Sequence, residues 1–275
     1  MILYQHNHVT VFQSALYLTT STVIETAHAI LIVDPTWLPQ EVSEIRRHVA
    51  QIRRGRSLYL LLTHSDWDHI LAAGAFPDAH RIASRAFVDN ADAHSIINQI
   101  VMFDDQWYLQ RDYPVFYPEI EFVVDRDDTR IQQEDLCLRL FLAPGHTACS
   151  IFAVEESSGV LLAGDYLSDV EFPYIYHSSA FYEDSLSKIT TLMKQKDLAL
   201  LVPGHGHIAH THVEINRRVE QSLRYIRTLR QFIRQHDQKA INRMIAQCPF
   251  PHVMSDYHQH NQQLMIRELA LSSPQ

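Results

Sequence analysis

Short apolar runs recur along most of the chain, and each has the length of a strand. Runs rich in β-branched and aromatic residues predict strands at residues 9–15, 17–23, 29–33 and 57–62. Later runs predict strands at residues 81–84, 136–142, 150–155, 160–163 and 199–202. Their apolar character is typical of buried strands.

Helical patterns separate these runs. Apolar residues recur every three or four positions after Pro39, at Val42, Ile45, Val49 and Ile52, and they predict an amphipathic helix. Residues 85–113 and 183–194 also have a mostly helical pattern, whereas residues 114–130 are irregular. From about residue 210 onward the pattern is helical.

The predicted elements follow the order β-rich, α/β, β-rich, α/β. This order predicts an α/β protein in which two similar halves pack into one domain, with sheets inside and helices outside. We therefore expect residues 1–275 to form a single domain that ends in a helical part from about residue 210.

Composition narrows the possible functions. Of the 275 residues, 46% are hydrophobic and 20% charged, which excludes a disordered chain, and the net charge of −9 argues against nucleic-acid partners and anionic membranes. There is no apolar run long enough to span a bilayer and no secretory signal pattern at Met1. The three widely spaced cysteines indicate no disulfide framework, so we expect a cytoplasmic protein.

Histidine and aspartate carry the chemical signal. The chain has 18 histidines, and His64, Asp66, Asp68 and His69 fall within the segment that directly follows the strand at residues 57–62. Three further positions follow predicted strands and are each preceded by a glycine: His146, Asp165 and His205. Glycine allows the sharp turns that bring such side chains to one point, and histidine is the commonest metal-ligating side chain.

This ordered set resembles the ligand pattern of the metallo-β-lactamase superfamily, over roughly residues 9–212. The resemblance implies an αββα sandwich with two central mixed sheets, outer helices and a two-metal site at one edge. It assigns one metal to His64, Asp66 and His146, and the other to Asp68, His69 and His205. It makes Asp165 the bridging ligand, with Asp68 and Asp165 acting on the nucleophile.

Asp66 departs from the family pattern, which most often has histidine there. Zinc is the expected ion at both sites, but carboxylate is a harder ligand than imidazole and brings iron or manganese into consideration. The flavodiiron branch of the superfamily is similar at this position, with a glutamate.

We expect a metallo-hydrolase of a small ester, thioester or lactone. An iron oxidoreductase of the flavodiiron or persulfide-dioxygenase type is the alternative that Asp66 suggests, and a phosphodiesterase and an inactive binding protein are the others. The resemblance makes Tyr166 and His177, in the aromatic loop 166–182, the candidate substrate contacts. The 103–117 segment is expected to cap the pocket, to form a homodimer contact or to join the core. The arginines of residues 213–236 indicate either a basic strip or the solvated face of an amphipathic helix.

Overall fold

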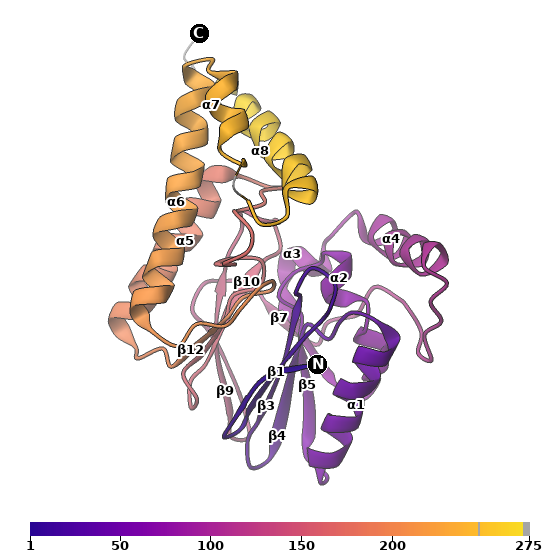
Figure 1. Cartoon of the computed structure of the whole chain (residues 1–275). Helices are drawn as coiled ribbons and strands as arrows, with labels where there is room; N and C mark the ends of the chain where they lie inside the picture. Colours follow the sequence, from indigo (N-terminus) through magenta and orange to yellow (C-terminus); the bar gives the residue numbers. More distant parts are fainter. Residues whose placement is uncertain (247, 272–275) are drawn as a thin grey trace.

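Two mixed β-sheets form the centre of the protein, whose computed structural model describes residues 1–246 and 248–271 (Figure 1). The first sheet has seven strands in chain order, antiparallel from β1 to β4 and parallel from β4 to β7. Its strands are β1 (Ile2–His6), β2 (Val9–Gln13), β3 (Thr20–Glu25), β4 (Ala29–Val33), β5 (Ser57–Leu61), β6 (His80–Ser84) and β7 (Phe122–Val124).

The second sheet has five strands in the order β12-β11-β10-β9-β8. The pairs from β8 to β11 are antiparallel, and β11 and β12 are parallel. Its strands are β8 (Thr129–Gln133), β9 (Leu136–Leu142), β10 (Ile151–Glu155), β11 (Val160–Leu162) and β12 (Leu200–Val202).

Helices cover the outer face of each sheet, as the opposite sides of Figure 1 show for α1 and α6. The first sheet packs against α1 (Pro39–Arg53), α2 (Trp67–Ile70), the 3-10 turn η1 (Ala73–Ala75), α3 (Arg85–Val88) and α4 (Ala93–Gln106). The second packs against α5 (Ser179–Gln195) and α6 (His212–Arg234), while α7 (Gln238–Arg243) and α8 (Pro251–Leu271) pack on α6. The expected αββα sandwich is confirmed.

Successive side chains of the central strands point to opposite faces of the sheet, and both faces are covered. This explains why the sequences of these strands are continuous apolar runs. Leu31 and Leu61 point into the core between the two sheets, whereas Ile30, Ile32 and Leu60 point toward α1 and its neighbours. All five are fully buried. A strand covered on both faces has no solvent side on which polar residues would be favoured.

The sequence patterns did not predict three of the strands. The peripheral β1 is partly exposed along its whole length, β7 has three residues, and β8 reads Thr-Arg-Ile-Gln-Gln with only Ile131 buried. Such strands lack the apolar run that the prediction used. The residues predicted as one mostly helical stretch, 85–113, form the two helices α3 and α4 instead.

The arginines of α6 are largely engaged within the protein. Arg218 is buried and binds Glu214 and the carbonyl oxygens of Leu167 and His207. Further along the helix, Arg227 and Arg230 both pair with Glu183 on α5. These pairs favour a structural role over a basic binding strip. Within the described part of the chain, no helix has the length and apolarity needed to cross a membrane.

Asn261 connects α8 to the loop between β11 and α5. Its side chain is completely buried, accepts a hydrogen bond from the Ile175 amide at 2.9 Å and donates to the Pro173 carbonyl at 2.6 Å. It also donates to the Tyr225 hydroxyl on α6 at 3.0 Å. One amide side chain therefore fixes a loop to two helices.

Replacing Asn261 by leucine should lower the free energy of unfolding by about 1–3 kcal/mol, because buried backbone groups of the loop lose their partners. Urea denaturation measures the change. Gln263→Leu, on an exposed position of the same helix, is the control and should change stability little. Equal stability losses in the two variants would contradict this role of Asn261.

Candidate metal centre

The ends of strands from both sheets place the predicted ligands at one edge of the sandwich. His64 lies just beyond β5, Asp165 just beyond β11 and His205 just beyond β12. The turn between β9 and β10 supplies His146, and α2 begins directly after Asp66. Loops on a rigid scaffold can converge in this way without distorting the strands themselves.

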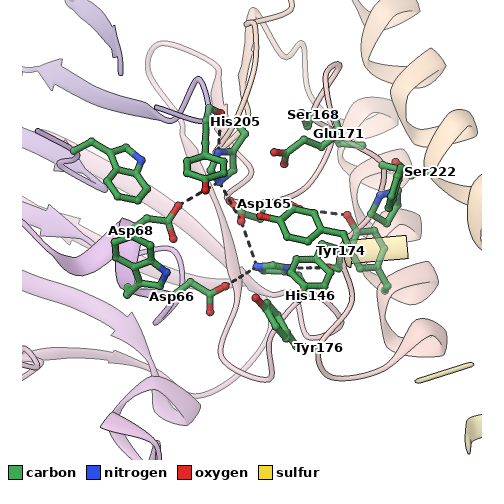
Figure 2. A pocket seen from close by; sticks show the side chains of 18 residues that line it. Asp66, Asp68, His146, Asp165, Ser168, Glu171, Tyr174, Tyr176, His205 and Ser222 are labelled. Carbon is green, nitrogen blue, oxygen red and sulfur yellow. Dashed lines mark hydrogen bonds and ion pairs between the residues drawn. The ribbon is translucent and has the colours of Figure 1, made fainter. Parts of the chain in front are cut away.

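All seven predicted ligands come together in two clusters. The first cluster is His64, Asp66, His146 and Asp165, and the second is Asp68, His69 and His205. In the first, an Asp66 carboxylate oxygen lies 3.2 Å from His146 Nε2. In the second, Asp68 lies 3.5 Å from His205 Nε2 and 3.7 Å from His69 Nε2. Figure 2 shows Asp66 extending toward His146 and Asp68 extending toward His205.

Asp165 lies between the two clusters. Its carboxylate oxygens are 3.0 Å from His69 Nε2, and 3.3 Å from Nε2 of both His146 and His205. His64 Nε2 is 3.6 Å away. A carboxylate that contacts imidazoles of both clusters has the position that a bridging ligand requires.

Each of the four imidazoles is oriented by a hydrogen bond at Nδ1, the ring nitrogen that points away from the centre of the site. His146 Nδ1 is 2.7 Å from the Tyr174 carbonyl oxygen, and His205 Nδ1 is 3.0 Å from the carbonyl oxygen of Tyr17. An Nδ1–H that donates to a carbonyl leaves the Nε2 lone pair directed into the site, which is the form that binds metal.

A buried chain of hydrogen bonds orients the other two. The Thr63 hydroxyl donates to Asp34, so its oxygen accepts from His64 Nδ1 at 3.0 Å. The same Asp34 oxygen accepts from His69 Nδ1 at 3.0 Å. Asp34 also accepts from the Thr63 amide at 2.9 Å, and one carboxylate thereby supports ligands of both clusters.

Burial lowers the pKa of the imidazoles, whereas the neighbouring carboxylates raise it. Burial lowers the pKa of His64 to about 4 and makes it a neutral ligand. Burial also disfavours the charged form of His205, but the Asp165 and Glu171 carboxylates outweigh it and raise the pKa of His205 to about 10. The pKa of Asp66 is lowered despite its burial, because the His146 imidazole lies beside it at 3.2 Å. The site is therefore strongly attractive to positive charge.

The residues fit a pair of metal ions. His64 Nε2 and His146 Nε2 are buried and have no hydrogen bond of good geometry among the described residues, although both face carboxylates. His69 Nε2 and His205 Nε2 face each other at 3.4 Å. Imidazole nitrogens with carboxylate oxygens suit zinc, iron or manganese, so the donor set leaves the metal identity open.

A pocket of about 150 Å³ opens above the clusters (Figure 2). Asp66, Asp68, His146, Asp165 and His205 lie on its floor. Aromatic rings form much of its wall: Tyr17, Trp37, Trp67, Phe172, Tyr174, Tyr176, Tyr182 and Tyr257. Neither lysine nor arginine occurs among the described residues that line it.

The two predicted substrate contacts lie outside this pocket. Tyr166 is buried behind the wall, where its hydroxyl donates to the Ala143 carbonyl at 2.8 Å and accepts from the His146 amide at 3.1 Å. His177 is exposed and stacks on Phe181. Tyr166 thus supports a ligand-bearing turn, and this geometry does not favour its contact with substrate. His177 lines the neighbouring groove, and its contact with substrate stays a prediction.

Residues 103–117 join the core, and none of them lines the pocket that they were expected to cap. Phe103 packs on Trp37 and Trp67, two residues of the pocket wall, at ring-centre distances of 5.0 and 5.1 Å. Trp107 and Tyr108 remain exposed. The segment therefore supports the wall from outside, and the homodimer contact stays a prediction.

Two acidic residues of the site were missed by the sequence analysis. Asp34 ends a buried apolar run in the same way as the predicted ligands do, so its position after β4 was an available signal. Glu171 lies in the irregular loop between β11 and α5, where no periodic pattern marks it, yet it lines the pocket.

Residues 16–205 match the sequence model of the metallo-beta-lactamase superfamily. The chain belongs to this superfamily. The match includes every residue of both clusters and ends at His205. No curated protein gives a significant match.

Solved structures share the fold at low sequence identity. The sec-alkylsulfatase Pisa1 from Pseudomonas sp. is 11% identical with a TM-score of 0.67, over 95% of this chain and 49% of that one. A metallo-beta-lactamase family protein from Thermus thermophilus is 17% identical with a TM-score of 0.65, over 96% and 93%. The superfamily protein ST1585 from Sulfolobus tokodaii is 15% identical with a TM-score of 0.54, over 80% and 87%. This chain spans about half the length of the alkylsulfatase.

Replacing Asp34 by asparagine should weaken metal binding about 10–100-fold, because His69 and Thr63 lose the carboxylate that orients them. Competition with a chromophoric chelator measures the affinity. Asp105→Asn, on the exposed side of α4, removes the same charge far from the ligands and should bind metal like the wild type. Wild-type affinity in Asp34→Asn would show that Asp34 does not support the centre.

Proposed function

We propose that this protein is a metal-dependent hydrolase with a dinuclear centre, acting on a small ester, thioester or lactone. The observation that carries the proposal is the convergence of four imidazoles and three carboxylates beneath one aromatic pocket, with five of these seven residues on its floor. When bound, two metal ions at such a site would lower the pKa of a water molecule and polarise the bond to be broken.

The chain's own residues supply orientation and proton acceptance. The Nδ1 bonds of the four imidazoles fix Nε2 toward the centre before any substrate arrives. Asp68 and Asp165 face the same space, and their carboxylate oxygens can accept hydrogen bonds from a water molecule that attacks the substrate. The aromatic wall limits the access of further water.

The pocket favours carboxylic esters over phosphate and sulfate esters. With no lysine or arginine among its described lining residues, nothing but the metal centre itself would meet the anionic group of such an ester. The alkylsulfatase shares the fold at 11% identity, and sulfate esters are therefore the competing class to be tested in the same screen.

Activity should depend on the clusters. The protein reconstituted with zinc, manganese or iron should hydrolyse a panel of acetate, thioester and lactone substrates. His146→Ala and His205→Ala should each reduce kcat/KM by at least about 100-fold, because each removes a metal ligand.

The control for this experiment is His210→Ala, an exposed histidine outside both clusters, which should retain wild-type kinetics. Turnover of sulfate or phosphate esters alone would refute the proposed bond type. Oxygen consumption by the iron-loaded protein, without hydrolysis, would favour the oxidoreductase that Asp66 suggests.

Asp66→His should raise the preference for zinc over manganese by about tenfold or more, since imidazole replaces a hard anionic ligand. Competitive loading followed by elemental analysis measures the ratio. Asp66→Asn serves as the comparison, because it removes the charge without adding an imidazole. An unchanged ratio in Asp66→His would show that Asp66 is not a ligand.

A further inference from the structure

Glu171 is the charged residue of the pocket lining that belongs to neither cluster. It lies between β11 and α5, and its carboxylate faces the same space as His205 and Asp165 (Figure 2). Across residues 1–246 and 248–271, no side chain donates a hydrogen bond to this carboxylate or forms an ion pair with it. Metal ions would neutralise the carboxylates of the two clusters. Glu171 belongs to neither cluster and would not be a metal ligand.

A carboxylate in this position needs a positive partner or a proton. Burial and the Asp165 and Asp68 carboxylates raise the pKa of Glu171, whereas the His205 imidazole lowers it. The Glu171 side chain is partly exposed and lines the pocket, so a cation brought by the substrate would give its carboxylate a charged partner.

Aromatic rings that line the same pocket as Glu171 suit a cation as well. Tyr17, Phe172 and Tyr257 line the same pocket, and the Glu171 charge contributes to raising the pKa of Tyr257. Tyr257 is held in place by stacking on Tyr174, with ring centres 4.0 Å apart and planes at 9°. Aromatic faces attract ammonium groups, and combined faces form the cages that bind quaternary ammonium.

A groove beside the pocket also has more carboxylates than positive charges. A neighbouring groove of about 890 Å³ shares Asp66, Trp67 and Tyr176 with the pocket. Its lining adds Asp89, Asp92 and Asp125 against one arginine, Arg85. An excess of carboxylates along the entrance raises the local concentration of cations.

We propose that Glu171, Tyr17, Phe172 and Tyr257 form a subsite for an ammonium group of the substrate. The inference rests on the proposed hydrolase function and refines it: the scissile ester lies at the two clusters, and a small substituted ammonium group lies against Glu171. The substrate class is therefore a cationic ester.

Binding tests the subsite without requiring turnover. Choline and 3,3-dimethylbutanol have the same shape, but only choline carries a positive charge. Trp37 and Trp67 line the pocket, so their fluorescence reports occupancy. We expect choline to bind at least about tenfold more tightly than the neutral alcohol, as a desolvated cation–aromatic and carboxylate site would require. Equal affinities would overturn the inference.

Two variants identify the source of the preference. Glu171→Gln keeps the size and hydrogen-bonding capacity of the side chain but removes its charge, and Tyr257→Leu removes one aromatic face. Each should reduce the ratio of the two affinities, Glu171→Gln to near one. Asp184→Asn, an exposed position on α5, is the matched charge control and should keep the wild-type ratio. A full preference in Glu171→Gln would overturn the role of Glu171.

Kinetics separate this inference from the proposed function. The metal-loaded protein should show a higher kcat/KM for acetylcholine than for 3,3-dimethylbutyl acetate, and the advantage should fall about tenfold in Glu171→Gln. Hydrolysis of both esters at equal efficiency would support the hydrolase and overturn the subsite. Absence of hydrolysis of both, with choline-selective binding, would overturn the hydrolase and support the subsite.

Discussion

Hydrogen bonds that join the two sheets at one edge are the constraint on which the metal centre depends. The Ile151 amide donates to the Thr63 carbonyl at 2.9 Å, and the Thr20 amide donates to the Gly204 carbonyl at 2.7 Å. Each bond links a strand end of one sheet to a ligand-bearing segment of the other. His64 thereby faces His146, and His69 faces His205, across the sheet junction, and the apolar core between the sheets maintains this alignment. Without that junction, the seven donors would belong to two unrelated surfaces.

Glycine is required where these segments approach most closely. A Cβ on Gly204 would lie 2.2 Å from an Asp165 carboxylate oxygen and 3.0 Å from the Gly164 carbonyl carbon. A Cβ on Gly145, whose φ is 144°, would lie 2.5 Å from the Tyr182 backbone. The glycines next to the ligands therefore permit the close packing of the turns, which is a stronger demand than chain reversal alone.

The ligands could be predicted because they lie in segments that follow buried strands and because together they match the superfamily's ligand pattern. His64, His146 and His205 all satisfy this rule. The pocket wall could not be predicted in the same way, since Tyr166, Tyr174 and Tyr176 look alike in the sequence of one irregular loop. Long-range contacts decide between them: Tyr166 turns inward under Phe152 and Tyr182, whereas Tyr174 is held at the pocket by Tyr257, over eighty residues away. Metal binding is thus encoded locally, and substrate contact is not.

The candidate ligands and part of the pocket wall also come from different regions of the chain. The superfamily match ends at His205, after the last candidate ligand, but the pocket continues with Ser222 from α6 and Tyr257 from α8. Asn261 binds the loop that carries Glu171 and Tyr174 to these same helices. The sheet edge therefore holds the candidate ligands, and α6 and α8 complete a pocket wall that is otherwise built from residues 17–182. Because α6 and α8 lie beyond the matched residues, the superfamily pattern accounts for the candidate ligands and leaves this part of the wall unspecified.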